Sequence, residues 1–549
     1  MKIKSAIKMG MLPIMAIFLP ITASQAAGVS AINVNNGVLI PWSSNLALNA
    51  TGQFIVFQSE YDLNGKYQGG QNLYLHDTVK KQTILADRKL SLLGAPNNYN
   101  PIMTPDGRFV AFDGLGEKNT DGKYGWDIFV RDNSARKTQL ITVNTLGKNS
   151  GARFDASYGN FQITPNSRFV AFESRQGDLV AKDTNQINDV FVRDRISKTT
   201  TLVSVNLSKV DSGNEKSTFR QISDDGRFVL FESDADDLVA NDINGKTDCF
   251  FRDLKLKRTK LLYDCSRAVV KNQYVVITTD KRLLVSDKNN VEDVYLYDLS
   301  TNKVKLVSFG QANKNFNPVL KYGASRLVGY STDLRYVLFN KRVGSPQEAE
   351  QIGWENVFLR DLKTNKVRLI SGNKSGKEIG GEGIALSSNG KTILYSSKMV
   401  LPGSVDTNKE EDYFLLDLAT NKTTLLSKSR VGVATGVESF RKIPGVFSSG
   451  KHKVPAITAN GNFVVFASNI GNLVSRDNNG KSDVFVRNVK TGDTQLVSSN
   501  AAGSNSGNDS SIDPVLSSDG HVVVFKSEAN DLIAKDSDKG EDWFMYKLP

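Results

Sequence analysis

The feature that most constrains the fold is a unit of four short apolar stretches that recurs along the chain. The clearest copy spans Val454–Ser499, and its apolar stretches are Ala456–Thr458, Phe463–Ala467, Val484–Arg487 and Thr494–Val497. Runs of β-branched and aromatic residues between turns rich in glycine, asparagine and aspartate are typical of β-strands. One four-stranded sheet cannot bury both of its faces alone, so we expect the copies to stack against one another.

The copies follow one another through almost the whole chain. The turn before the second apolar stretch begins at Gly52, Asp106, Asn166, Asp225, Asn272, Asp333, Asn389, Asn460 and Asp519. Most copies lie about 55–62 residues apart, and four-stranded units at this period indicate a β-propeller. We therefore predict an all-β propeller of four-stranded antiparallel blades with about nine repeats. Eight or seven blades stay open, because nine is above the usual range and the fifth and sixth repeats are the weakest.

The two ends of the chain suggest how the ring closes. Val29–Asn35 resembles the fourth stretch of other copies, such as Leu202–Asn206, and the last copy ends at Pro549 without a fourth stretch. We expect the N-terminal segment to complete the last blade, which removes an exposed sheet edge. The predicted propeller covers 27–549, with repeats near 41–95, 96–150, 151–208, 209–266, 267–309, 310–374, 375–428, 450–500 and 501–549.

The first 26 residues have the pattern of a secretory signal peptide. Lys2, Lys4 and Lys8 precede the apolar run Met9–Ile21, and small residues around Ser24–Ala26 suit cleavage. A retained membrane anchor is the alternative, although the run is short for a membrane span. We expect a bacterial protein of the periplasm or the medium, with no membrane span after the signal is removed.

The formal charge of +11 is modest for 549 residues. It favours anionic partners or serves solubility alone, and the chain has no nucleic-acid-binding motif. The expected partner is an envelope protein or an anionic glycan, and we expect a monomer. The loop between Ser427 and Val454 is the longest and most basic, so it is either a partner site or an insertion without a binding role. Its candidate partner residues are Arg430, Phe440, Arg441, Lys442, Lys451 and His452.

The chain has two cysteines, Cys249 and Cys265, in the third strand and just after the fourth strand of one predicted blade. The hairpin that joins these strands brings the two residues roughly opposite each other. In an oxidising compartment this geometry permits a structural disulfide; two packed thiols are the alternative.

The loops between the second and third strands carry a recurring pattern, Asp-x-Asn/Asp-x-x-x-Asp. Alternating oxygen side chains followed by a further carboxylate could surround Ca²⁺, although the spacing is shorter than in an EF-hand. The alternative is purely structural, with the first aspartate forming an Asx-turn and the last opening the third strand. The candidate ligands are Asp183, Asn185, Asp189, Asp242, Asn244, Asp248, Asp287, Asn289, Asp293, Asp406, Asn408, Asp412, Asp477, Asn479, Asp483, Asp536, Asp538 and Asp542.

The repeats resemble a known bacterial family. The string Ser/Thr-x-Asp-Gly-Arg-Phe-Val-x-Phe, followed by Asp-Val-Phe-Val-Arg-Asp, looks like the TolB-type, WD-like propeller repeat, and Gln221–Asp253 and Ala456–Asn488 match it best. The resemblance implies a propeller fold with a binding or scaffolding role. It does not extend to the α/β domain that precedes the TolB propeller, so a role in the Tol–Pal system does not follow.

An enzyme would need a constellation of catalytic residues. The three histidines, His76, His452 and His521, fall in separate copies, and the chain lacks Gly-x-Ser-x-Gly, His-Glu-x-x-His and Cys-x-x-Cys. We therefore expect a non-catalytic exported propeller that binds a protein or an envelope glycan. The alternative is a propeller enzyme acting on polysaccharide, a glycoside hydrolase or lyase that uses loop carboxylates.

Overall fold

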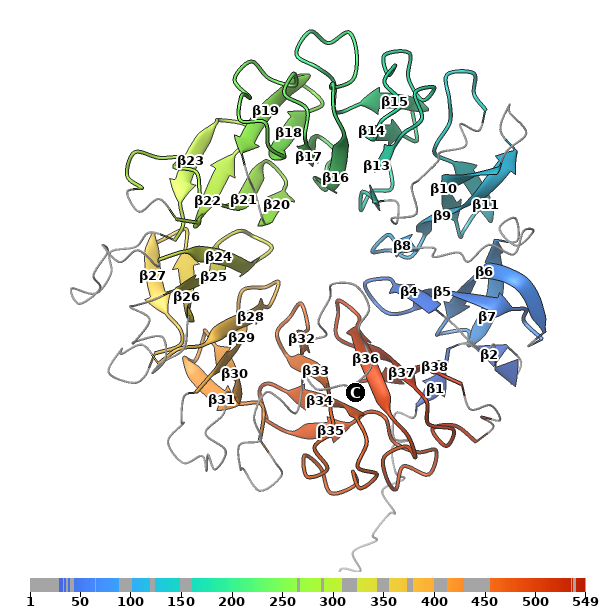
Figure 1. Cartoon of the computed structure of the whole chain (residues 1–549). Helices are drawn as coiled ribbons and strands as arrows, with labels where there is room; N and C mark the ends of the chain where they lie inside the picture. Colours follow the sequence, from blue (N-terminus) through green and yellow to red (C-terminus); the bar gives the residue numbers. More distant parts are fainter. Residues whose placement is uncertain are drawn as a thin grey trace, which may run out of the picture.

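The computed structural model describes residues 29–548 with gaps. The gaps are 33, 36–37, 40–43, 65, 88–100, 119–123, 149–159, 264–266, 288–290, 309–322, 343–354, 373–378, 399–411, 429–454, 535 and 537–539. Within the described part the strands form nine four-stranded antiparallel sheets and no helix. The sheets are arranged in a ring, with the first strand of each sheet nearest the centre (Figure 1). The prediction of a nine-bladed propeller is therefore confirmed.

We number the blades 1 to 9 in chain order, beginning with the sheet of β4. Blades 1 to 5 include the fifth repeat, one of the two weakest in the sequence. Their strands are β4 (Ser44–Leu48), β5 (Phe54–Tyr61), β6 (Tyr67–Asp77) and β7 (Gln82–Asp87); β8 (Ile102–Met103), β9 (Phe109–Lys118), β10 (Tyr124–Asp132) and β11 (Lys137–Leu140); β12 (Phe161–Ile163), β13 (Phe169–Ser174), β14 (Asp189–Asp194) and β15 (Thr199–Leu202); β16 (Ser217–Ile222), β17 (Phe228–Ser233), β18 (Asp248–Asp253) and β19 (Arg258–Tyr263); and β20 (Arg267–Lys271), β21 (Tyr274–Thr279), β22 (Asp293–Asp298) and β23 (Lys303–Leu306).

The remaining blades complete the ring. Their strands are β24 (Ser325–Tyr330), β25 (Tyr336–Arg342), β26 (Glu355–Asp361) and β27 (Lys366–Leu369); β28 (Glu382–Leu386), β29 (Thr392–Ser397), β30 (Asp412–Asp417) and β31 (Lys422–Leu425); β32 (Ala456–Ile457), β33 (Phe463–Ser468), β34 (Asp483–Asn488) and β35 (Thr494–Leu496); and β36 (Ser511–Leu516), β37 (Val522–Ser527) and β38 (Asp542–Lys547), joined by β1 (Ser30–Ala31). A separate pair consists of β2 (Val34–Asn35) and β3 (Val38–Leu39).

The N-terminal strand closes the ring as predicted. In β1, Ser30 and Ala31 pair with Met545 and Phe544 of β38. The next residue, Ile32, is fully buried, and its N–H donates to the carbonyl of Trp543 over 3.1 Å. The edge of the last sheet is thereby covered by the beginning of the chain.

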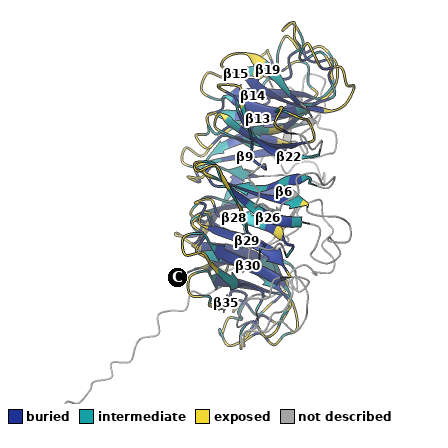
Figure 2. Cartoon of the chain, turned by 90° about the vertical axis from the view of Figure 1, so that its left-hand side faces the viewer, coloured by how far each residue is buried: buried dark blue, intermediate teal, exposed yellow. Residues whose placement is uncertain are grey.

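The core lies between the blades rather than inside any one of them. Seen from the side the ring is a flat disc, with buried strands and exposed turns (Figure 2). Phe191 of β14 stacks on Phe172 of β13 with ring centroids 5.7 Å apart, and both belong to one hydrophobic cluster with Val130 of the preceding blade. Burying one such aromatic side chain stabilises the fold by about 1.5–3 kcal/mol, so each blade depends on its neighbours for its core.

The connections of an antiparallel propeller divide between two rims. The turns between first and second strands and between third and fourth strands lie on one rim, which we call the turn rim. The loops between second and third strands and the connectors between blades lie on the other, the loop rim. No helix in the described part of the chain is long and apolar enough to cross a membrane.

Candidate metal sites

In five blades a carboxylate at or near the start of the third strand accepts a hydrogen bond from a hydroxyl group. In blade 3, Ser204 Oγ donates to Asp189 Oδ1 over 2.6 Å, and the N–H of Val190 donates to Ser204 Oγ over 2.9 Å. The equivalent hydroxyl bonds are Thr142–Asp127, Ser308–Asp293, Ser427–Asp412 and Ser498–Asp483. The hydroxyl that follows the fourth strand thus ties the start of the third strand to the outer edge of the blade.

Blade 6 shows that this role does not require a charge. There Asn356, the second residue of β26, takes the place of the carboxylate, and Ser371 Oγ donates to its Oδ1 over 2.9 Å. Val357 N–H donates to Ser371 Oγ over 2.9 Å, as in the other blades. An amide therefore performs the same structural function, and the negative charge at this position elsewhere requires a separate explanation.

In blade 3 a second buried carboxylate accompanies the first. Asp183 lies in the loop between β13 and β14, and both Asp183 and Asp189 are almost completely buried. Their Oδ2 atoms accept no hydrogen bond from any described residue. Burial raises the pKa of Asp183 to about 6 and that of Asp189 to about 8, and repulsion from Asp183 adds to the shift at Asp189.

The connector from blade 3 to blade 4 covers this pair of carboxylates. Thr184 Oγ1 donates to Asp211 in the connector over 2.5 Å, and Asn185 Nδ2 donates to the carbonyl of Gly213 over 2.8 Å. Ser212, which lies between Asp211 and Gly213 in the connector, donates a long hydrogen bond to Asp183 Oδ1 at 3.4 Å. The pair is therefore enclosed by its own loop on one side and by the connector on the other.

Blade 8 repeats the arrangement in detail. Asp477 is 4% exposed, and neither of its carboxylate oxygens accepts a hydrogen bond from a described residue. Ser506 Oγ in the connector to blade 9 also has no partner there. Burial raises the pKa of Asp477 to about 6 and that of Asp483 to about 7, with repulsion from Asp477 contributing to the latter.

In both sites an asparagine side chain forms hydrogen bonds within the loop and to the connector. Asn479 Nδ2 donates to Asp483 Oδ2 over 2.9 Å and to the carbonyl of Gly507 over 2.7 Å. The Oδ1 atoms of Asn185 and Asn479 accept the N–H of the residue two positions on. These asparagine oxygens therefore form Asx-turns, whereas the structural interpretation of the sequence assigned the Asx-turn to the first aspartate of the pattern. Because they are already bonded, the two oxygens are not counted among the candidate ligands.

Blade 4 has the same pair of carboxylates with a tighter internal bond. Asn244 Nδ2 donates to Asp248 Oδ2 over 2.5 Å. Burial, together with repulsion from Asp248, raises the pKa of Asp242. This blade thus carries a similar excess of buried negative charge.

The remaining candidate ligands are only partly placed. In blade 5 the hydroxyl of Tyr295 donates to Asp287. Asp412, Asp536 and Asp542 are described, whereas Asn289, Asp406, Asn408 and Asp538 lie outside the described residues. Sequence reasoning missed Ser212 and Ser506, although each is the second residue of a short Asp/Asn-Ser-Gly-Asn string that recurs in the two connectors.

The chemistry of the two complete sites suits a hard cation. Two carboxylates, a serine hydroxyl and nearby backbone carbonyls are oxygen ligands of the kind Ca²⁺ prefers. Histidine and cysteine, which zinc favours, are absent from these sites. Among the described residues, no three His, Cys, Asp or Glu side chains gather at one point, so hydroxyl and carbonyl oxygens or water would have to complete the coordination.

Other sequence-based predictions stay untested. Cys249 is buried in β18 and lies opposite Tyr263, two residues before Cys265, which is outside the described residues. The partner-loop residues Arg430, Phe440, Arg441, Lys442, Lys451 and His452 lie in the undescribed segment 429–454, and the predicted signal peptide is undescribed as well.

Comparison with known proteins identifies no family. No family model and no curated protein sequence matches the chain. Similar solved structures include Porphyromonas gingivalis dipeptidyl peptidase 4, with 11% identity, a TM-score of 0.46 and coverage of 91% of this chain and 67% of that one. A eukaryotic initiation factor has 12% identity, a TM-score of 0.44 and coverage of 83% and 88%. The β-propeller domain of the Trilobed protease from Pyrococcus furiosus has 12% identity, a TM-score of 0.31 and coverage of 72% and 95%.

These comparisons correct the functional expectation drawn from the sequence. The propeller proteins among them include peptidases, so a non-catalytic scaffold for a protein or an envelope glycan is not what they support. The polysaccharide-degrading alternative finds no support either. Peptidase activity is a property of those proteins and is not carried over to the present chain.

Proposed function

We propose that this chain is a calcium-binding propeller in which Ca²⁺ ties the loops between second and third strands to the connectors between blades. The observation that carries the proposal is Asp477, a buried carboxylate with no hydrogen-bond donor among the described residues and a second carboxylate, Asp483, beside it. An uncompensated buried charge is strongly unfavourable, and repulsion from a second carboxylate beside it adds to the penalty. A cation between them would remove this penalty.

The matching site in blade 3 supports the same proposal. Asp183, Asp189 and Ser212 occupy the places of Asp477, Asp483 and Ser506, so the arrangement is not peculiar to one loop. In each case the proposed ligands come from one loop and from the connector to the next blade. Bound Ca²⁺ would therefore stabilise the contact between neighbouring blades.

We also propose that the protein is an exported TolB-type repeat protein. The basic and apolar segments before Ala26 support export, and the Asp-Gly-Arg-Phe-Val-x-Phe repeats support the family. Export suits the calcium proposal, because extracellular calcium modules bind with Kd values of roughly 10⁻⁴–10⁻³ M. Sites with two carboxylates each are adequate for that range.

Melting curves of the full chain with Ca²⁺ and with a chelator test the proposal. Binding to the folded state alone at about 100 times Kd would stabilise the protein by about 2.7 kcal/mol per site. Asp483→Asn keeps the hydrogen bond from Ser498, as Asn356 does in blade 6. We expect this variant to melt higher than the wild type in chelator and to lose part of its response to Ca²⁺.

The matched control is Asp519→Asn on the turn rim. It removes the same charge, and Asn460 and Asn166 occupy the equivalent turn in other blades. We expect its calcium response to equal that of the wild type. Identical wild-type melting curves with Ca²⁺ and with chelator would reject the proposal, as would a full calcium response in a variant carrying both Asp183→Asn and Asp483→Asn.

A further inference from the structure

The turn rim carries an arc of cations on four consecutive blades. In the turns between third and fourth strands of blades 1 to 4, the fourth turn residue is Lys81, Arg136, Lys198 or Lys257. All four are exposed, and their φ angles are 53°, 53°, 59° and 53°. None of them forms an ion pair with a described residue. We call the four turns, 78–81, 133–136, 195–198 and 254–257, the basic arc.

The choice of residue at this position runs against local backbone preference. Lysine and arginine are disfavoured in the left-handed region, where asparagine and glycine are the usual residues. Blades 5 to 7 follow that preference, with Asn302, Asn365 and Asn421 at φ angles of 58°, 60° and 58°. Cations are thus present on one arc of the ring where an asparagine would satisfy the turn better.

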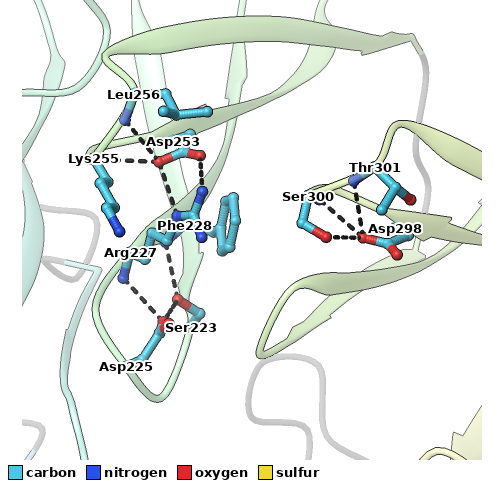
Figure 3. Close-up of polar contacts among 10 residues, drawn as sticks. All are labelled: Ser223, Asp225, Arg227, Phe228, Asp253, Lys255, Leu256, Asp298, Ser300 and Thr301. Atoms are coloured by element: carbon cyan, nitrogen blue, oxygen red, sulfur yellow. Dashed lines mark hydrogen bonds and ion pairs between the residues drawn. The ribbon is translucent and has the colours of Figure 1, made fainter.

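The acidic residues next to these turns accept hydrogen bonds from the turn backbone. Asp253 accepts the N–H groups of Lys255 and Leu256 over 2.9 and 3.1 Å (Figure 3). It also pairs with Arg227 at 2.7 Å. Asp132 and Asp194 cap their turns in the same way and pair with Arg108 and Arg168. The carboxylates are therefore already neutralised, while the tip cations project with their charge uncompensated.

Apolar side chains project beside these cations. Val79 is 66% exposed, Ile196 is 74% exposed and Leu256 is 55% exposed, each within the same turn as one of the cations. The corresponding turn of blade 5 has Ser300 and Thr301 instead, which bond to Asp298 (Figure 3). The basic arc thus combines exposed aliphatic groups with unpaired positive charge.

We propose that the basic arc docks the propeller on an anionic lipid bilayer surface. Lysine and arginine near such a surface are attracted to the acidic headgroups, and aliphatic side chains beside them can enter the interface. The turns are separate points along a rim and form no groove, so they suit a flat and extended partner. A free polyanion would use the charges but would leave the aliphatic side chains exposed to water.

Co-sedimentation with vesicles tests this proposal without reference to calcium, because every sample contains chelator. The full chain is mixed with vesicles of phosphatidylcholine alone or with phosphatidylglycerol added. We expect binding to the anionic vesicles only, weakening with salt. A variant with asparagine at Lys81, Arg136, Lys198 and Lys257 places in these turns the residue that blades 5 to 7 use. Each cation near such a surface contributes roughly a fivefold factor in partitioning, so we expect a loss of about 100-fold or more.

The loop rim supplies the matched control. Asparagine at Lys148, Lys209, Lys246 and Lys281 removes the same charge from exposed positions on that rim, and we expect binding to persist. A second variant, Val79→Ser with Ile196→Ser and Leu256→Ser, should also weaken binding. Equal losses in the two asparagine variants would overturn the proposal. Full binding by the serine variant would overturn it too. The aliphatic side chains would then contribute nothing, and the arc would bind by charge alone, as it would bind a free polyanion.

Discussion

At the scale of single residues, positions shared by all blades carry different chemistry in different blades. His76 of β6 stands where five of the other third strands have arginine, and it is 5% exposed with Nδ1 2.9 Å from Thr83 Oγ1. Burial lowers the pKa of His76 to about 4, opposed by Asp77 and assisted by Lys547 of the last blade. The imidazole is therefore a neutral part of the interface between the first and last blades.

The buried, neutral state of His76 predicts that acid lowers the stability of the fold. Between pH 6.5 and pH 4 the unfolded chain binds a proton at His76 that the folded chain does not, so stability falls as pH falls through this window. The loss amounts to about 3 kcal/mol in the free energy of unfolding. Denaturant unfolding at a series of pH values should show a shallower dependence for His76→Gln than for the wild type. Parallel curves would contradict the assignment.

A glycine in the turn rim tests the contact between neighbouring blades. Gly226 has a φ of +76°, and a Cβ there would lie 2.1 Å from Cδ2 of Phe169 in the preceding blade. Gly245 has a φ of +63° and nothing within 4 Å of an added Cβ. We expect Gly226→Ala to lower the free energy of unfolding by about 2–4 kcal/mol and Gly245→Ala by about 1 kcal/mol. Equal effects in chemical unfolding would show that the interblade contact is unimportant.

At the scale of elements, the second and third strands were readable from the sequence and the first strands much less so. β13 and β14 consist of strong β-formers, and each is bounded by a turn signal. First strands such as β8 have two residues, and others are fixed from outside: the N–H of Phe219 in β16 donates to Glu173 of the preceding blade over 2.9 Å. Propensity within a strand cannot reveal a bond that reaches it from another blade.

The ligands of the candidate calcium sites were likewise only partly readable from the sequence. The spacing of Asp477 and Asp483 within one loop was visible in the sequence, because local loop geometry brings the two together. Ser506 lies in the connector after the fourth strand, and it reaches the pair only because that connector folds back, with its N–H donating to the carbonyl of Arg476 over 2.8 Å. The serine ligand therefore reaches the two carboxylates only after the whole blade has folded.

At the scale of the whole molecule, the two rims hold their carboxylates in different ways. The loop rim holds buried carboxylates beneath its connectors, and the turn rim holds its carboxylates in caps and ion pairs while lysine and arginine project. Alternation of strand direction produces this division, since every second connection falls on the same rim. A cation within one rim and a lipid surface at the other can therefore act independently.

The ring itself depends on closure by the first strand. Ile32 is fully buried in one hydrophobic cluster with Val524 and Met545 of the last blade and Ile55 of the first, so it joins the two ends of the propeller. Truncating such a side chain costs about 2–5 kcal/mol. We expect Ile32→Ala to lower the free energy of unfolding by that amount and to speed proteolytic removal of the N-terminal strand. Ile196→Ala, at an exposed turn, should change stability by less than about 0.5 kcal/mol. If both variants unfolded like the wild type, the closing strand would not hold the ring together.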